Sequence, residues 1–393
     1  MIDRKNQILA INGGPKVSDE TIVIHKPYLD EADFEMVNQT VRSTYISGNG
    51  PACMEFEKKL AAYLGAKHVL YTNSCTTALD LAFRVKDFPA GSEVIVPNFT
   101  YTSTALGALL NNLTIKLIDV DPDNGNINVG NIESAITEKT VAIAPVDYAG
   151  NPADMNPIMD IASKYNLYVV HDTAQSIGAV YRGQKTGMLA DIATFSFHGT
   201  KNLTTGEGGA IVTQRDEIAE RLLFMREKGT DKQSFLVDNK TRGFYEYVDI
   251  GSSYVQSNIL GALGTTQLQK IDWMNDQRRQ IAEFYKQELA DIPELSFLKT
   301  TKDSQPNWHI FGILVPPEHR YWIMDALRAE GVYANVHYTP LHRNKFYQGL
   351  ATDEEMPGSM TFFNRLLRLP IYPSLTLAER EKVVKAVKKV FNG

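Results

Sequence analysis

A lysine stands just past an apolar segment in the stretch FSFHGTKN of residues 195–202, and the glycine-rich run GEGG follows at 206–209. Small residues flank this lysine, Lys201, so an ordinary surface charge is poorly placed there. Partial burial lowers the pKa of an amine, which favours the free base that forms Schiff bases. A loop lysine that extends its ammonium to solvent would have the same sequence, so Lys201 alone does not decide the chemistry.

A second candidate is Asp172, which follows the apolar run 167–170 in the stretch HDTAQS of residues 171–176. A carboxylate at the end of a buried strand is costly unless it meets a cation or a strong hydrogen-bond donor. A protonated pyridine nitrogen would satisfy it. Capping of the next turn is the ordinary alternative.

Two weaker signals also follow apolar runs. The stretch TNSCTTA of residues 72–78 opens a predicted helix, and a helix start of this kind presents free backbone N–H groups to a phosphate. Taken alone, this stretch is better explained by ordinary N-capping by Ser or Thr. The stretch PNFTY of residues 97–101 offers an aromatic side chain that could stack on a flat ring, although, taken alone, core packing is the better explanation. The order of the four features along the chain favours a site for pyridoxal phosphate (PLP). This cofactor needs a phosphate anchor, a ring cover, an acid for its nitrogen and a Schiff-base lysine.

The elements that position these residues are read from hydrophobic periodicity. Short apolar runs, several rich in Val, Ile and aromatic residues, are typical of buried strands. Helical segments at 76–84, 132–137 and 158–165 alternate with the first five runs, which predicts a mostly parallel sheet covered on both faces. Ligands bind beyond the carboxyl ends of such strands. The predicted strands are 68–71, 94–96, 115–120, 141–146, 167–171, 192–197 and 210–212.

After residue 215 the pattern becomes helical over 217–227, and a polar and aromatic loop follows at 229–254. A long helical run covers about 257–289, and a second unit occupies roughly 292–393. We therefore predict a large α/β domain at 1–256, with an N-terminal arm. A connecting helix and a small C-terminal α+β domain are predicted at 257–393.

Composition limits the possible partners and location. The 393 residues are 43% hydrophobic and 22% charged, with a net charge of −6, which argues against a nucleic-acid partner. Cys53 and Cys75 are the two cysteines, so a reduced, cytoplasmic setting is expected. The first 14 residues lack the apolar core of a secretory signal. No apolar run approaches the roughly 20 residues that cross a bilayer, so no membrane partner is expected.

These motifs resemble those of the DegT/DnrJ-type nucleotide-sugar aminotransferases. The most specific stretches are HDTAQ at 171–175 and FSFHGTKN at 195–202 with GEGG, and the similarity runs from residue 47 to the stretch RLLRLP at 365–370. The resemblance implies the fold-type I aspartate-aminotransferase fold and PLP as cofactor, with its pyridoxamine phosphate form arising during the reaction. It also implies a homodimer whose active sites lie between the subunits, and it implies no metal.

The resemblance also assigns roles. Lys201 corresponds to the Schiff-base lysine and Asp172 to the partner of the ring nitrogen. Five more residues correspond to cofactor contacts: the ring-hydroxyl neighbour Gln175, the stacking Tyr101, the backbone groups of Cys75 and Thr76, and the hydroxyl of Ser196. Three histidines are candidates for substrate contact: His198, His337 and His342.

One phosphate contact departs from the family pattern. Many members supply an Asn or Arg from the partner subunit shortly after a Gly-Tyr pair. The matching segment here reads GSSYV at 251–255, so Val255 replaces the usual polar side chain. Ser252 or Ser253 is the expected substitute.

The implied reaction moves an amino group from an amino acid, usually L-glutamate, to a nucleotide-linked keto-sugar. Segments 226–230, 249–254 and 337–342 are most similar to the dTDP-4-amino-4,6-dideoxygalactose transaminases. They favour dTDP-4-keto-6-deoxyglucose as acceptor, in a pathway to lipopolysaccharide or O-antigen. Amination at carbon 3 and UDP- or GDP-linked sugars stay open.

Three rival functions share an α/β or PLP fold. A PLP-dependent sugar dehydratase typically has His in place of Lys201. An NAD-dependent oxidoreductase would carry G-x-G-x-x-G after the first strand, where this chain has Asn73-Ser74-Cys75. A regulatory or binding protein would not need the intact set of Lys201, Asp172 and Gln175.

Overall fold

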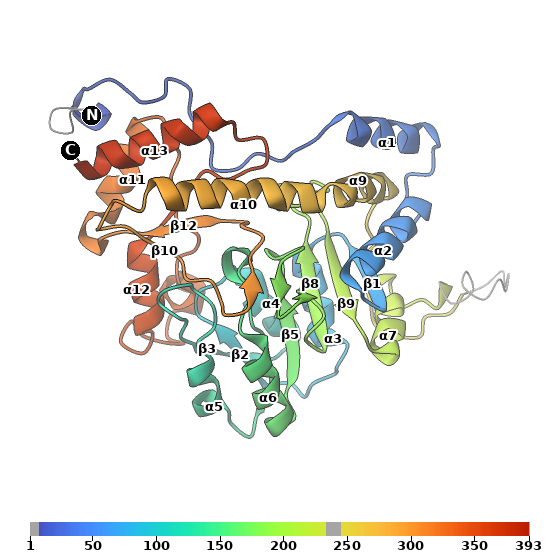
Figure 1. Cartoon of the computed structure of the whole chain (residues 1–393). Coiled ribbons are helices and arrows are strands. Elements are labelled where there is room, and N and C mark those ends of the chain that lie inside the picture. Colours follow the sequence, from blue (N-terminus) through green and yellow to red (C-terminus); the bar gives the residue numbers. More distant parts are fainter. Residues whose placement is uncertain (1–7, 233–244, 393) are drawn as a thin grey trace.

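The computed structural model describes residues 8–232 and 245–392. Its centre is a seven-stranded sheet with the order β1-β9-β8-β5-β4-β2-β3 (Figure 1). Five strands run parallel from β8 to β3, whereas β9 is antiparallel to both of its neighbours. The strands are β1 (His68–Thr72), β2 (Glu93–Pro97), β3 (Thr114–Ile118), β4 (Thr140–Ile143), β5 (Tyr168–Asp172), β8 (Ile192–Ser196) and β9 (Gly209–Thr213). The predicted strands and the mostly parallel sheet are therefore confirmed.

Helices cover both faces of this sheet because successive strand residues point to opposite sides. In β2, Val94 and Val96 enter one apolar core while Ile95 enters another. The first core includes residues of α3 (Cys75–Arg84), α4 (Thr102–Leu109) and α7 (Asp216–Arg226). On the other side lie α2 (Pro51–Leu64), α5 (Ile132–Ala135) and α6 (Met155–Tyr165).

The long helical run predicted at 257–289 is two helices, α9 (Asn258–Gln269) and α10 (Ile271–Glu288), which meet at Lys270. The ammonium of Lys270 lies 2.7 Å from Asp30 and 2.6 Å from Asp33, at the start of α1 (Glu31–Arg42). These ion pairs fix the break. Before it, α9 packs so closely on α2 that a Cβ at Gly261 would lie 2.6 Å from the Cys53 nitrogen.

Apart from the cores on the two faces of the large sheet, the chain has a further apolar core, which we call the second core. It is formed by α10, α11 (Arg320–Ala329), α13 (Leu377–Asn392) and a three-stranded antiparallel sheet. Its strands are β10 (Ser296–Phe297), β12 (Phe311–Leu314) and β13 (Leu366–Leu369), and α12 (Pro357–Arg365) leads into β13. Two-residue strands β6 (Val180–Tyr181), β7 (Gln184–Lys185) and β11 (Ser304–Gln305) form a third sheet. The predicted domain boundary at 256/257 stays a prediction.

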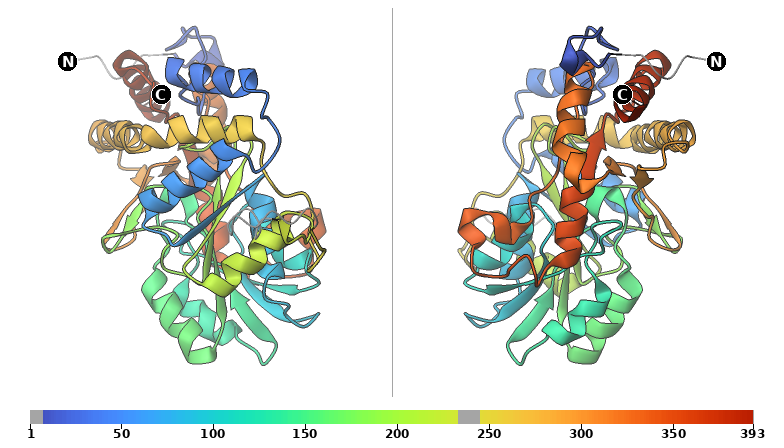
Figure 2. Two further views of the ribbon diagram at one scale, coloured as in Figure 1. Left: turned by 90° about the vertical axis from the view of Figure 1, so that its right-hand side faces the viewer. Right: turned by 90° about the vertical axis from the view of Figure 1, so that its left-hand side faces the viewer.

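The N-terminal segment belongs to this second core. Leu9 and Ile22 are buried in it, and Ile22 forms a parallel bridge with Val332. Glu330 accepts hydrogen bonds from the backbone nitrogens of Ala10 (2.8 Å) and Val17 (3.1 Å). Figures 1 and 2 accordingly show the two ends of the described chain side by side near α11. Short 3-10 turns complete the fold at Ala10–Asn12, Val129–Asn131, Tyr148–Gly150, Pro317–His319, Leu341–Arg343 and Lys345–Tyr347.

Glu330→Ala is expected to destabilise the protein strongly. Glu330 is 0% exposed and lies 2.8 Å from the ammonium of Lys389, which is 4% exposed in its side chain. Breaking a buried pair leaves an uncompensated charge and costs about 3–5 kcal/mol. Urea unfolding at neutral pH measures the loss. Lys388→Ala, which removes a more exposed pair with Asp291, is the control and should cost less than about 1 kcal/mol. Equal losses would contradict the prediction.

Candidate active site

Asp172 ends β5 at the carboxyl edge of the parallel strands, and only 5% of it is exposed. The hydroxyl of Thr104 donates to Oδ2 at 2.7 Å, and the Ala174 N–H donates to Oδ1 at 3.1 Å. No ion pair reaches this carboxylate from the residues that the structure describes. Burial raises the pKa of Asp172, against the opposing effects of Thr104, Ala174 and Lys201. A buried carboxylate with neutral donors only is suited to a cationic ligand atom such as a protonated ring nitrogen.

Lys201 lies in the turn between β8 and β9. Its backbone N–H donates to the carbonyl of His198 at 2.9 Å, and Phe197 bonds to both Thr205 and Gly208, which closes the turn. Within 8–232 and 245–392, the Lys201 Nζ has no hydrogen bond or salt bridge. Burial lowers the pKa of Lys201, as does Arg368, while Cys75 and Asp172 raise it. A free, partly desolvated amine is what Schiff-base formation requires.

The expected phosphate anchor is the start of α3. Cys75 is its first residue, and Ser74 caps it by accepting the Thr77 N–H at 3.1 Å. Gly209 of β9 passes against this helix start, where a Cβ would lie 2.4 Å from the Cys75 nitrogen. Ser196, the last residue of β8, pairs with Gly209 in the ladder. The glycine therefore brings Ser196 and the N-terminus of α3 together, a geometry that fits a phosphate.

Gln175 and Tyr101 are brought together by a residue to which the sequence assigned no role, Tyr338. The Gln175 amide nitrogen donates to the Tyr338 hydroxyl at 3.2 Å, and its oxygen accepts the Ala149 N–H at 2.8 Å. The ring centroids of Tyr101 and Tyr338 are 5.6 Å apart. Tyr101 is 56% exposed, which leaves its ring free for stacking. The stretch HYTPLH at 337–342 was the one sequence feature that could have indicated a role for Tyr338. No local sequence feature indicated a role for Thr104.

The three candidate histidines have different surroundings, and His337 Nδ1 lies 2.6 Å from Arg368 Nη1. The His342 nitrogens lie 3.0 Å from Asn98 Oδ1 and 2.9 Å from Asp353 Oδ1, so both are engaged by the protein. His198 is half exposed and lies 3.0 Å from the Thr200 hydroxyl. Their contact with substrate stays a prediction, although the structure favours a positional role for His342.

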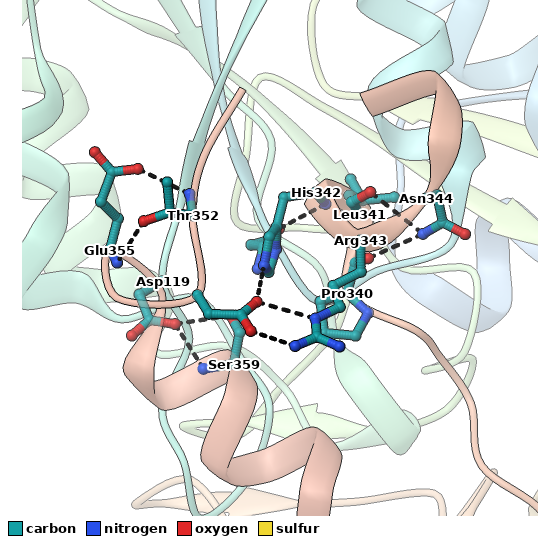
Figure 3. A network of polar contacts seen from close by, with 11 residues as sticks. Asp119, Pro340, Leu341, His342, Arg343, Asn344, Thr352, Glu355 and Ser359 are labelled. Carbon is teal, nitrogen blue, oxygen red and sulfur yellow. Dashed lines mark hydrogen bonds and ion pairs between the residues drawn. The ribbon is translucent and has the colours of Figure 1, made fainter. Parts of the chain in front are cut away.

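Figure 3 shows the network around His342. Asp353 also pairs with Arg343, and Asp119, just past β3, accepts hydrogen bonds from the backbone nitrogens of Gly358 and Ser359 at 2.6 Å each. The segment after Tyr338 is thereby fastened to the ends of β2 and β3. These contacts keep the Tyr338 hydroxyl within hydrogen-bond distance of Gln175.

Val255 forms an antiparallel bridge with Thr72, next to the helix start, while Ser252 and Ser253 are exposed. The predicted contact of Ser252 or Ser253 with a partner subunit's phosphate stays a prediction. Among the described residues, no cluster of three or more His, Cys, Asp or Glu is arranged to hold a metal ion.

Thr104→Val is expected to lower kcat/KM about 10- to 100-fold. The change removes a hydrogen bond to a charged carboxylate, which is worth about 1.5–3 kcal/mol. Steady-state kinetics with saturating cofactor measures the effect. Thr102→Val on the same helix, whose hydroxyl bonds to Tyr347 at 2.5 Å, is the control and should change kcat/KM less than threefold. Comparable losses in both variants would mean that helix packing, and not Asp172, is responsible.

Comparison with known proteins agrees with this geometry. Residues 27–388 match the model of the DegT/DnrJ/EryC1/StrS aminotransferase family. GDP-perosamine synthase of Caulobacter vibrioides is 34% identical over 377 residues, which cover 94% of this chain and 98% of the relative. Helicobacter pylori PseC, an aminotransferase in the biosynthesis of pseudoaminic acid, superposes with a TM-score of 0.88 at 29% identity, covering 95% and 99% of the chains.

The sugar aminotransferase Spr1654 from Streptococcus pneumoniae, described as putative and solved in its PMP form, has a TM-score of 0.88 at 27% identity, with 94% and 98% of the chains covered. The fold is thus that of fold-type I PLP enzymes. The chain belongs to the DegT/DnrJ/EryC1/StrS aminotransferase family. It is a PLP-dependent nucleotide-sugar aminotransferase, which confirms the class and cofactor predicted from the sequence. In the described part of the chain, no helix has the length and apolar character needed to cross a bilayer.

Proposed function

We propose that the enzyme transfers the amino group of L-glutamate to dTDP-4-keto-6-deoxyglucose, giving a dTDP-4-amino-4,6-dideoxyhexose. Two observations on the described residues carry the reaction type: none of them forms a hydrogen bond or salt bridge with the Lys201 amine, and none places a cation against the buried Asp172 carboxylate. The choice of dTDP rests on the segments 226–230, 249–254 and 337–342. A GDP- or UDP-linked sugar, or amination at carbon 3, is the alternative, and the relative named GDP-perosamine synthase favours keeping GDP in the test.

The proposed role of each site residue follows from its position. When bound, PLP accepts the electron pair released at the substrate carbon. Lys201 Nζ carries the proton to and from that carbon, a role that suits an amine whose pKa burial lowers. Asp172 keeps the ring nitrogen protonated, and Thr104 holds the carboxylate in place. Gln175 would contact the ring hydroxyl, and Tyr101 would cover the ring.

We also propose a homodimer with shared active sites. Large apolar side chains stand exposed on the single chain within residues 245–250 and in the segment before α2. They include Tyr247 (73% exposed), Ile250 (66%) and Tyr45 (53%). A second copy would bury them beside Ser252 and Ser253. The cytoplasmic location and a role in lipopolysaccharide or O-antigen synthesis remain predictions from the sequence.

The function is tested by absorbance and then by an acceptor panel. The holoenzyme should show the visible band of a lysine Schiff base, and L-glutamate should convert it to the pyridoxamine form. The converted enzyme is then mixed with 4-keto-6-deoxy sugars linked to dTDP, GDP or UDP, and with a 3-keto isomer. We expect the visible band to return fastest with the dTDP-4-keto sugar. Faster return with another acceptor would replace the proposed substrate, and absence of any conversion by amino acids would refute the proposed reaction.

A further inference from the structure

A buried network of amide side chains begins directly after Lys201 and includes one histidine, His309. Asn202, which follows Lys201 in the chain, is 4% exposed, and His309 is 7% exposed. The Asn202 amide nitrogen donates to the Asn275 Oδ1 at 2.8 Å and to the Asn307 carbonyl at 3.0 Å. The Asn202 Oδ1 lies 3.1 Å from His309 Nδ1. The segment before β12 is thereby tied to the turn that carries Lys201.

Asn307 ties the same segment to the turn that carries Gln175. Asn307 is 2% exposed, and its amide nitrogen donates to the carbonyls of Gln175 at 2.9 Å and Ile177 at 3.0 Å. Its Oδ1 accepts the backbone N–H of His309 at 3.0 Å. Gly150, with a φ of +79°, leaves room for this side chain, because a Cβ there would lie 1.8 Å from the Asn307 Oδ1. His309 is therefore fixed between two turns that carry site residues.

The hydrogen bonds determine where the proton of the His309 ring lies. The Asn202 amide nitrogen donates to two acceptors, so the orientation of this amide is fixed and its Oδ1 can only accept. His309 Nδ1 must therefore donate to it, which in a neutral ring leaves a free lone pair on Nε2. Burial, followed by the charge of Lys201, holds the pKa of His309 well below its usual value, so the ring is neutral at neutral pH. Within the part of the chain that the structure describes, no hydrogen bond engages Nε2.

The surroundings of His309 indicate what this lone pair can accept. Lys201 is the cation that acts most strongly on the ring. The other ionisable groups that act on Lys201 or His309 are Arg278 of α10, Arg368 of β13, His25, Cys75 and Asp172. The arginines have no acceptor, and Asp172 is assigned to the ring nitrogen of the cofactor. The Lys201 amine becomes an ammonium when it takes a proton from the substrate carbon, and a neutral lone pair beside it is suited to that ammonium.

We propose that His309 is a positioning residue for proton transfer, whose Nε2 accepts a hydrogen bond from the Lys201 ammonium once Lys201 has left the cofactor. The inference rests on the proposed amino transfer, in which Lys201 carries the proton. No covalent bond changes at His309. The proton stays on Nζ, because the surrounding cations oppose a positive charge on the imidazole. Lys201 can therefore return the same proton later in the reaction.

Two variants of His309 separate this role from a purely structural one. His309→Asn places an amide nitrogen near the position of Nδ1, which keeps the bond to Asn202 but removes the acceptor at Nε2. His309→Gln places an amide oxygen near the position of Nε2 and loses the bond to Asn202. We expect His309→Asn to slow the L-glutamate half-reaction about 10- to 100-fold, the range for loss of a hydrogen bond to a charged group, and His309→Gln to slow it less than about fivefold. Equal losses, or the reverse order, would show that His309 acts only through its packing and would overturn the proposal.

L-glutamate deuterated at its α-carbon shows whether proton transfer is the affected step. In His309→Asn, the ratio of the half-reaction rates with protium and deuterium should stay at the wild-type value or rise above it. The KM for L-glutamate should change less than about threefold, because the lost contact is made to Lys201 and not to the donor. A ratio that falls towards one would place the defect in another step and contradict the role assigned to His309.

Chemical labelling of Lys201 supplies a readout that needs no amino donor. Wild type and both variants are loaded with pyridoxamine phosphate, so that Lys201 is free, and are treated with acetic anhydride over a range of pH. Peptide mass analysis follows the acetylation of Lys201. Because an acceptor stabilises the ammonium, its loss in His309→Asn should move the midpoint of labelling about one pH unit lower, whereas His309→Gln should keep it. Lys185 in the same digest is the internal control, and its midpoint should not change.

The labelling also separates this inference from the proposed function. If wild type is not converted by any amino acid, the proposed function fails, and the midpoint for Lys201 still decides the inference. A midpoint that moves lower in His309→Asn supports the contact, and an unchanged midpoint overturns it.

Asn202→Ala is the variant to use should His309→Asn fail to fold. It keeps the imidazole but removes the partner that orients the ring. The midpoint for Lys201 should then move in the same direction by a smaller amount. An unchanged midpoint would overturn the proposal.

Discussion

Lys201→Ala will leave a folded protein that has no visible Schiff-base band and at least about 10⁴-fold lower turnover, because one amine both holds the cofactor and moves the proton. The structure gives the Lys201 Nζ no competing hydrogen bond or salt bridge among the described residues, and burial lowers its pKa. Absorbance at neutral pH after addition of PLP measures the first effect. Single-turnover kinetics with L-glutamate measures the second.

Lys185→Ala is the matched control for this experiment. Burial also lowers the pKa of Lys185, but its ammonium lies 3.2 Å from the ring centroid of Tyr63 and 2.9 Å from the Tyr63 carbonyl. This variant should keep the band and the turnover. Borohydride reduction of wild type, followed by peptide mass analysis, should place the label on Lys201. A label on another lysine would refute the assignment.

Asp172→Asn should lower kcat about 10²- to 10³-fold, the range seen when one electrostatic contact to the reacting system is lost. The side chain keeps its shape, so the hydrogen bond from Thr104 can persist while the negative charge is gone. Without the nearby negative charge, the pKa of the ring nitrogen of bound PLP would fall and the nitrogen would lose its proton. The shift of the visible band with pH and the glutamate half-reaction rate are the two measurements.

Asp147→Asn is the control for Asp172, because it removes a second fully buried carboxylate nearby. The Asp147 carboxylate contacts His171 at 2.8 Å and accepts hydrogen bonds from the Ser176 hydroxyl at 2.6 Å and the Ala153 N–H at 2.8 Å. We expect a loss of stability with the spectrum retained. If Asp172→Asn also lost only stability, its role at the ring nitrogen would be excluded.

The strands and the positions of Lys201 and Asp172 could be predicted from the sequence, because both follow buried apolar runs at the edge where parallel strands end. Tyr338 could not be given a role in this way. It stands far along the chain, and it reaches the site only because the second core packs beside the sheet.

The break at Lys270 and the placement of the N-terminal segment were missed for a related reason. Helical periodicity continues through residues 257–289, whereas the break depends on Asp30 and Asp33, more than 200 residues earlier. Local patterns carry no information about such distant partners. Likewise, no pattern within residues 8–24 predicts that two of their backbone N–H groups donate hydrogen bonds to Glu330.

The meeting of residues 8–24 with α11 and α13 has a consequence for how the chain matures during translation. Glu330 contacts Ala10 and Val17 at one end of the sequence and Lys389 at the other. The sheet of residues 68–213 has all its strands once that stretch has left the ribosome. The smaller unit is completed only after Lys389 has been translated. Until then residues 8–24 lack part of the surface on which they pack, so this contact forms late in synthesis.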